Sequence, residues 1–143
     1  MHILKVSTDK RKIGDIGEHA AARYLRKNGY RVLRKNYVAL GYEIDIIAEN
    51  REVIAFIEVK TRTVDGDLSS VESRPAASVT PEKQGKIILA AKWFRAGYRK
   101  ERMMRFDVIE VYLDKNKKVH NIMHLESAFN GNTARAAAPR KGY

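Results

Sequence analysis

Four charged side chains stand in two segments of this sequence that otherwise have the composition of buried strands. Glu43 and Asp45 lie in the first apolar segment of the stretch 42–62, and Glu58 and Lys60 lie in the second. Burying a carboxylate without a partner costs on the order of several kcal/mol. The cost of burying these charges must therefore be offset by a metal ion, by pairing among the four side chains, or by a position at the rim of a sheet.

The alternation of side chains along a strand predicts which way these charges face. Glu43 and Asp45 share one face of their strand, and Glu58 and Lys60 share one face of the next. A two-residue loop near Asn50 would place Glu43 opposite Glu58, and a four-residue loop would place Asp45 there. Either register puts all four charges on one face, whereas a loop of odd length would separate them. The other face would carry the core residues Ile44, Ile46, Val53, Ala55, Ile57 and Val59.

An aspartate followed by Glu-x-Lys on the adjacent strand could support metal-dependent hydrolysis of a phosphodiester. Carboxylates at a cross-strand spacing of roughly 5 Å could share a hard cation such as Mg2+, which prefers oxygen ligands. The cation would offset phosphate charge and activate a water molecule, while Lys60 could orient that water and face the phosphate oxygens. From these two strands alone, ion pairing on an exposed face is an equally good interpretation.

Four short motifs follow one another in the chain. They are Gly14-Asp15-Ile16-Gly17-Glu18-His19-Ala20-Ala21, Glu43-Ile44-Asp45-Ile46-Ile47, Phe56-Ile57-Glu58-Val59-Lys60-Thr61-Arg62 and Arg105-Phe106-Asp107-Val108. In this order they resemble the YraN family, uncharacterised bacterial proteins similar to archaeal Holliday-junction resolvases of the PD-(D/E)xK nuclease superfamily. The resemblance covers about residues 13–129. It departs from the family at Tyr42, where a second glycine usually follows Gly41.

The resemblance implies an α/β domain of restriction-endonuclease-like architecture, in which helices flank a mixed β-sheet. It also implies an endonuclease that depends on Mg2+ or Mn2+, with branched DNA as a candidate substrate. Asp107 is expected to have a structural role, or to support a residue of the site, and not to be a metal ligand. The assigned residues are Asp45, Glu58 and Lys60 as catalytic groups, Glu18, Asp45 and Glu58 as metal ligands, Glu43 and Gln84 as accessory groups, and Lys83 and Arg62 as nucleic-acid contacts.

A first helix is expected over residues 13–28, where apolar residues recur at helical spacing until Gly29 ends the pattern. Glu18 borders the apolar stripe of this helix. The alternative to a metal ligand there is an edge glutamate that reaches water or pairs with Arg23 or Lys60. Three further strands are expected over residues 30–36, 103–113 and 119–125.

A second helix is expected to begin at Thr80, as its N-cap, and Pro81, as its first residue. Lys83 lies on the apolar face of this helix and could point into the mouth of the site. The alternative is a lysine whose stem is buried and whose ammonium is solvated. Trp93 and Phe94, further along, are interpreted as core residues and not as platforms for base stacking.

The net charge of +11 is unevenly distributed along the 143 residues. Residues 1–35 and 92–143 each carry a net charge of +7, whereas residues 36–91, which hold the candidate ligands, carry −3. Basic flanks would attract a polyanion in a salt-sensitive manner, and DNA is the expected partner. The alternatives are solubility, anionic lipid or ribosome association, a nucleic-acid-binding module that does not cut, and a basic subunit of a nucleoprotein assembly.

The length predicts one endonuclease-like domain over residues 13–129. Residues 1–12 are expected to form a mobile basic arm, and residues 130–143 a disordered basic tail. Residues 63–79 are expected to form a flexible loop at the rim of the site, with a disordered insertion without a role as an equally good alternative. The longest apolar runs are too short to span a membrane or to act as a signal peptide, and cysteine is absent. We therefore expect a cytoplasmic protein, with a homodimer left open.

Overall fold

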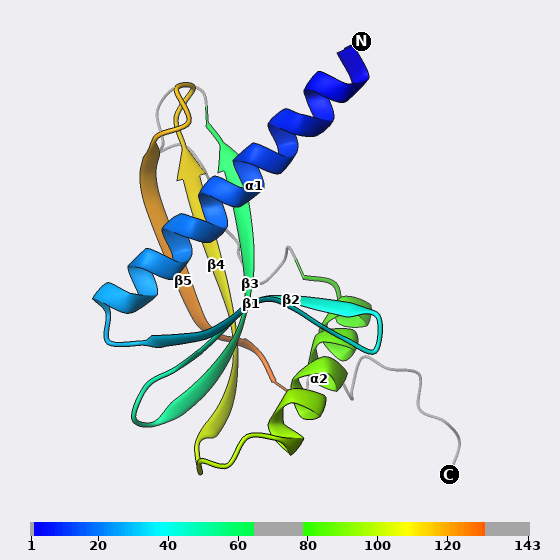
Figure 1. The fold of residues 1–143 in the computed structure, drawn as a ribbon. Helices are drawn as coiled ribbons and strands as arrows, with labels where there is room; N and C mark the ends of the chain where they lie inside the picture. The colour runs from blue at the N-terminus through cyan, green and yellow to red at the C-terminus, as the bar shows by residue number, and fades with distance from the viewer. Residues whose placement is uncertain (1, 65–78, 131–143) are drawn as a thin grey trace.

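The computed structural model describes residues 2–64 and 79–130, with side chains from Lys10 onward. Two helices and five strands follow one another along the chain (Figure 1). They are α1 (His2–Lys27), β1 (Arg31–Ala39), β2 (Tyr42–Glu49), β3 (Val53–Thr63), α2 (Pro81–Ala96), β4 (Met103–Leu113) and β5 (Val119–Phe129).

The five strands form one sheet in the order β1-β2-β3-β4-β5. Neighbouring strands are antiparallel except for β3 and β4, which pair in parallel. A parallel pair requires a crossover connection, and the segment that contains α2 provides it. The fold is therefore α/β with a mixed sheet, which agrees with the predicted class and is compatible with a restriction-endonuclease-like architecture.

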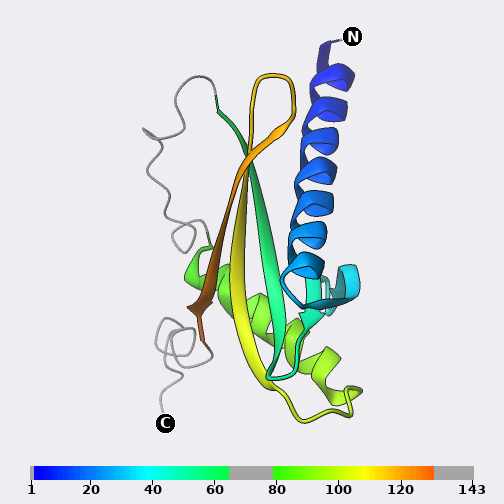
Figure 2. The same ribbon diagram turned by 90° about the vertical axis from the view of Figure 1, so that its left-hand side faces the viewer.

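Each face of the sheet is covered by one helix, as Figures 1 and 2 show. On one face, Ala21, Ala22 and Leu25 of α1 pack in a cluster with Ile46 and Ile57. The other face holds a second cluster, in which α2 packs against β2 and β3 through Ile87, Ala90, Ala91, Ile47 and Phe56. Strands buried on both faces are typical of sheets with a parallel crossover, and this explains why β2 and β3 are so apolar.

The expectation of a single core face was therefore incomplete, and it was wrong for Ile44. This residue packs on the α2 face, while Ile46 packs on the α1 face, although strict alternation would place both on the same side. Between them lies Asp45, opposite a left-handed residue of β1, Asn36, with φ 51°. The far end of the β1–β2 hairpin is twisted out of line with β3–β5 (Figure 1), and Asn36 lies in this part of the hairpin.

The boundaries of several elements differ from those expected. Helix α1 begins at His2 and not near Ile13, so the segment predicted to be a mobile arm continues the helix. Gly29 ends the helix as predicted, with φ 86°. Thr80 caps α2 as predicted, since its Oγ1 accepts a hydrogen bond from Lys83 N at 3.2 Å. The predicted loop 63–79 lies for the most part, and the predicted tail 130–143 almost entirely, outside the described residues.

Candidate metal centre

The candidate site lies at a fork in the sheet, where β2 separates from β3. The ladder between the two strands runs from Glu49–Ile54 to Ile46–Ile57, which is the register of the predicted four-residue loop. Beyond this pair the backbone ladder ends, and Val59 N–H donates to the side chain of Asp45, at 2.8 Å from its Oδ2. The Asp45 carboxylate thus replaces a carbonyl of the ladder and is held in one orientation at the base of the fork.

Three carboxylates converge at this fork. Oxygens of Glu18, Glu43 and Asp45 all lie within 4.8 Å of one another, an arrangement that could hold one metal ion. Glu18 comes from α1, and the other two come from β2. The group differs in one member from the predicted set of metal ligands, because Glu43, expected as an accessory residue, occupies the place predicted for Glu58. The twist at the end of the hairpin carries Glu43 away from β3 and toward α1.

The position of Glu18 depends on a close approach between α1 and β3. Gly17 is buried, and a Cβ atom added to it would lie 1.7 Å from Thr61 Oγ1 and 2.8 Å from Thr61 Cβ. Only glycine therefore lets the helix lie this close to the strand. The contact brings the next residue of the helix, Glu18, over the fork.

Asn36 joins the two glutamates on the open side of the site. With its amide nitrogen turned toward the carboxylates, Asn36 donates to Glu43 Oε1 at 2.8 Å and to Glu18 Oε2 at 3.1 Å. This orientation is the favourable one, because the amide oxygen would otherwise face negatively charged oxygens. A short polar side chain is also what tolerates the left-handed backbone at this position.

Glu58 lies beside the three carboxylates but is paired with lysines. Its Oε1 accepts from Lys83 Nζ at 2.5 Å and lies 3.6 Å from Lys60 Nζ. Glu58 is 7% exposed, whereas the Lys60 and Lys83 side chains are 32% and 42% exposed, so both lysines are partly open to solvent. Lys83 thus pairs with Glu58 and remains partly exposed to solvent.

Burial and mutual repulsion raise the pKa values of two of these acids. Burial, followed by the charge of Glu58, raises the pKa of the Asp45 carboxyl from 3.8 to about 7, although the bond from Val59 opposes the shift. Burial and the charge of Glu43 raise the pKa of Glu18, while the bond from Asn36 lowers it. Burial alone would lower the pKa of Lys83, but the bond to Glu58 outweighs it and raises that pKa. The site therefore favours an added positive charge.

A groove of about 560 Å³ opens beside these groups. Glu18, Asp45, Glu58 and Lys60 contribute to its walls, and Lys10 of α1 stands at its edge. The acids are therefore accessible to a ligand although Asp45 is partly buried. The remaining wall residues are Ile13, Gly14, Val59, Thr61 and Thr63.

The two other residues predicted to take part lie further out. Arg62 Nε donates to Glu110 Oε1 at 3.1 Å, and its side chain is 53% exposed, so part of the guanidinium faces solvent. Gln84 is buried, and its Nε2 donates to Val79 O at 3.0 Å. Among the described residues, its Oε1 has no hydrogen-bond partner. Gln84 therefore supports the segment that leads into α2 and is not part of the carboxylate group.

Asp107 lies at a different place, where it fastens β4 to β5. It is fully buried and accepts hydrogen bonds from Arg105, from Ser127 N at 3.0 Å and from the His124 ring at 2.8 Å. Burial alone would raise the pKa of Asp107, but the hydrogen bonds from His124 and Arg105 outweigh it and hold that pKa below the usual value. Tyr24 of α1 bonds the other nitrogen of His124 at 3.1 Å. Asp107 thus has the structural role expected of it.

The sequence analysis missed Asn36 and the function of Gly17. An asparagine in the middle of a strand was the available signal for Asn36, since asparagine is depleted in strands and enriched in the left-handed region. The signal for Gly17 was a glycine inside a helix, which costs about 1 kcal/mol relative to alanine and so requires a packing reason.

Comparison with known proteins agrees with this arrangement of motifs. Residues 17–111 match the model of the uncharacterised protein family UPF0102. A UPF0102 protein of Chlorobaculum parvum is 44% identical over 122 residues, which cover 82% of this chain and 91% of that protein. Another, of Caldanaerobacter subterraneus subsp. tengcongensis, is 40% identical over 123 residues, covering 85% of this chain and 97% of that protein. The chain therefore belongs to the UPF0102 or YraN family, as its four motifs had indicated.

Proposed function

We propose that this protein is a nuclease of the PD-(D/E)xK type that uses Mg2+ or Mn2+ to hydrolyse phosphodiester bonds in nucleic acid, with branched DNA as the first substrate to test. The observation that carries the proposal is the group formed by Glu18, Glu43 and Asp45, whose oxygens lie within 4.8 Å of one another beside an open groove. Crowded carboxylates repel one another, and a hard cation with oxygen ligands offsets that repulsion.

The residues present fit such a cation. Glu18 and Asp45 offer partly buried oxygens from two elements, Glu43 offers an exposed one, and the raised pKa of Asp45 reflects the low polarity and negative charge around it. A bound Mg2+ or Mn2+ would offset charge on the phosphate and lower the pKa of a coordinated water. Val59 N–H fixes the Asp45 carboxylate, so this ligand is already oriented before any cation binds.

The lysines supply the remaining charge. Lys60 and Lys83 converge on Glu58 Oε1 from β3 and α2, and each is partly exposed at the mouth of the site. In the proposed mechanism Glu58 holds the two ammonium groups in place, Lys60 orients the attacking water, and both lysines face the phosphate oxygens. Fixed positive charges of this kind stabilise negative charge that develops in a transition state.

The test is a cleavage assay on matched substrates. Four-way junctions, flaps, single strands and duplexes of DNA and RNA are incubated with the protein in Mg2+, Mn2+ or EDTA. We expect metal-dependent cleavage, its loss in Asp45→Asn, and a decrease on the order of a hundredfold or more in Lys60→Ala. Lys92→Ala, which removes an exposed lysine of α2 outside the site, is the control and should cut like the wild type.

The main rival is a nucleic-acid-binding module that has no chemical step. It predicts that the wild type binds these substrates without cutting any of them, and that Asp45→Asn binds equally well. That combination of results would overturn the nuclease proposal. Reduced cleavage in Lys60→Ala with nearly unchanged binding would instead assign Lys60 to the chemical step, since the many other basic residues would carry the affinity.

A further inference from the structure

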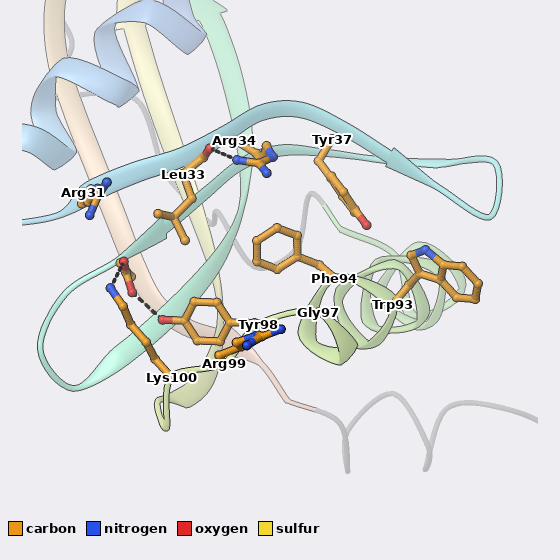
Figure 3. Close-up of a pocket in the computed structure, with 11 residues that line it drawn as sticks. Arg31, Leu33, Arg34, Tyr37, Trp93, Phe94, Gly97, Tyr98, Arg99 and Lys100 are labelled. Atoms are coloured by element: carbon orange, nitrogen blue, oxygen red, sulfur yellow. Dashed lines mark hydrogen bonds and ion pairs between the residues drawn. The ribbon is translucent and has the colours of Figure 1, made fainter.

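A second groove lies on the molecule away from the carboxylates, and no step of the proposed hydrolysis uses it. It runs between β1 and the end of α2, has a volume of about 570 Å³, and is shown in Figure 3. We call it the aromatic groove. Its lining residues are Arg31, Leu33, Arg34, Tyr37, Glu49, Trp93, Phe94, Gly97, Tyr98, Arg99 and Lys100.

Aromatic rings form much of the groove. Phe94 packs edge-on against Tyr37, with ring centroids 5.3 Å apart, and lies 6.1 Å from the ring of Tyr98. Phe94 also packs against the core, as predicted. The prediction that Trp93 is a core residue was wrong, because 62% of it is exposed. The groove thus combines three rings that pack against the core, those of Tyr37, Phe94 and Tyr98, with the exposed indole of Trp93.

The charge of the groove is positive. Arg31, Arg34 and Arg99 are exposed along it. Its one carboxylate, Glu49, is 5% exposed and bonds to the Tyr98 hydroxyl and to Lys100 Nζ at 2.8 Å. Burial alone would raise the pKa of Glu49, but the bonds from Lys100 and Tyr98 outweigh it and lower that pKa. Glu49 is therefore an ionised group that orients Tyr98 and Lys100. The exposed arginines give the accessible surface of the groove its positive charge.

We propose that the aromatic groove binds unpaired bases of a nucleic-acid strand, with Trp93 as a stacking surface and the arginines on the adjacent phosphates. Exposed rings beside a basic track are the combination that binds single strands, because every base has a flat face and every linkage has a negative charge. A base paired within a duplex has its faces covered by its neighbours and cannot stack on Trp93 in this way. The proposal rests on the proposed function only in taking nucleic acid as the ligand.

The position of the groove would suit a substrate that has both paired and unpaired parts. Tyr37 of the groove directly follows Asn36, whose amide contacts Glu18 and Glu43 at the fork. The two sites therefore lie on either side of β1, an edge strand of the sheet. A nucleic-acid strand held in the aromatic groove would pass over this edge to reach the carboxylates. The groove would then select junctions, flaps or single-stranded ends over continuous duplex.

The sequence offers a direct probe, because Trp93 is its only tryptophan. A single-stranded oligothymidylate is titrated into the wild-type protein in EDTA, and tryptophan emission is followed together with the anisotropy of a label on the oligonucleotide. Stacking of a base on Trp93 should quench the emission in parallel with binding. A backbone of the same length made of abasic residues should bind through its phosphates but leave the emission unchanged.

Two variants of α2 form a matched pair for affinity. Trp93→Ala should weaken binding of the oligothymidylate by about tenfold, which is the effect of losing one stacked base. Leu89→Ala removes another exposed apolar side chain of the same helix, 53% exposed, which does not line the groove, and it should leave the affinity unchanged. Equal affinities of the two variants would overturn the proposal.

The phosphate contacts have their own measurement. Replacing Arg34 and Arg99 together with glutamine should reduce the slope of log affinity against log salt by about two. Replacing Lys115 and Lys117, which lie in the turn between β4 and β5, with glutamine should reduce this slope by a smaller amount. A larger reduction from the lysine pair would place the strand elsewhere and overturn the proposal.

The outcomes separate this proposal from the nuclease proposal. Binding without quenching, or equal quenching by the abasic backbone or by duplex, would overturn the groove proposal and leave the nuclease proposal intact. Quenching in a protein that cuts no substrate would support the groove proposal and contradict the nuclease.

Discussion

Replacing Asp45 with asparagine should stabilise the metal-free protein at alkaline pH. Burial and the charge of Glu58 raise the pKa of Asp45 from 3.8 to about 7, and each unit of such a shift corresponds to about 1.4 kcal/mol. The full shift of about three units would cost the folded state roughly 4 kcal/mol once the group is ionised. Asparagine has nearly the same shape, carries no charge, and can still accept the hydrogen bond from Val59 N–H.

The measured effect should be smaller than this limit. Asp45 is not fully buried, and neighbouring groups and water can adjust to its charge. We expect Asp45→Asn to increase the free energy of unfolding by about 1–2 kcal/mol at pH 8, which corresponds to a rise in melting temperature of about 3–8 °C for a chain of this size.

The pH dependence gives the prediction its sign. An acid whose folded pKa is raised contributes no penalty below about pH 4, where it is protonated in both states, and its penalty grows as the pH rises toward 7. The gap between Asp45→Asn and wild type should therefore be near zero at pH 4 and largest at pH 8. Urea denaturation in EDTA at several pH values measures it. Glu52→Gln, a change of an exposed acid in the turn between β2 and β3, serves as the control and should show no such trend.

Adding a divalent cation should reverse the order of stability. A cation that binds the folded wild type stabilises it by mass action, whereas Asp45→Asn has lost a charged ligand and should gain little from Mg2+ or Mn2+. A variant that is no more stable than wild type in EDTA at pH 8, or whose difference from wild type is the same at pH 4 and at pH 8, would refute the reasoning.

Three further outcomes can be checked with standard assays. Gly17→Ala should destabilise the protein by about 1–3 kcal/mol, because the new methyl group would clash with Thr61. Gly14→Ala, with open space around it, should be neutral or stabilising in thermal denaturation. Similar losses of stability in both variants would contradict the close contact between α1 and β3. Asp107→Asn should destabilise the protein at pH 7 by removing the buried carboxylate that pairs with Arg105 at 2.8 Å. Because the pKa of Asp107 is lowered in the folded state, its ionised carboxylate contributes fully to the free energy of unfolding above about pH 4, and this contribution is lost as the pH falls through the folded pKa. The difference in stability between Asp107→Asn and wild type should therefore narrow in acid denaturation. A difference that does not depend on pH would argue against the charged network. Binding to nucleic acid should weaken steeply with salt, as filter-binding or anisotropy titrations would show, and a flat salt dependence would mean that the basic residues serve another purpose.

Much of the site could be predicted because it depends on local periodicity. Alternation along the strands placed Glu43 with Asp45 and Glu58 with Lys60, and the apolar composition on both sides of them indicated buried strands. The observed register of β2 and β3 was one of the two considered. The N-cap at Thr80 was also local, since it needs only the right residue before a helix.

The rest depended on how elements meet, which periodicity does not report. Glu43 lies beside Glu18 in the part of the hairpin that holds the left-handed residue Asn36, and the apolar periodicity of the strands does not predict that conformation. The early start of α1 was missed because an apolar stripe marks the packed part of a helix, and exposed residues such as Lys10 to Lys12 can be helical without one. Trp93 was assigned to the core by residue type, although its position on α2 leaves it exposed.

The hydrogen bond from Val59 N–H to Asp45 bears on how activity should be inferred across relatives of this chain. One backbone donor at the fork lies beyond the ladder of β2 and β3, and an oxygen at position 45 satisfies it. Folding alone would therefore retain an acceptor there even in a protein that had ceased to act on any substrate, and asparagine would suffice for that purpose. Under the nuclease proposal, an acid in place of an amide at this position, where the acid is costly to bury, is therefore the feature to compare among relatives.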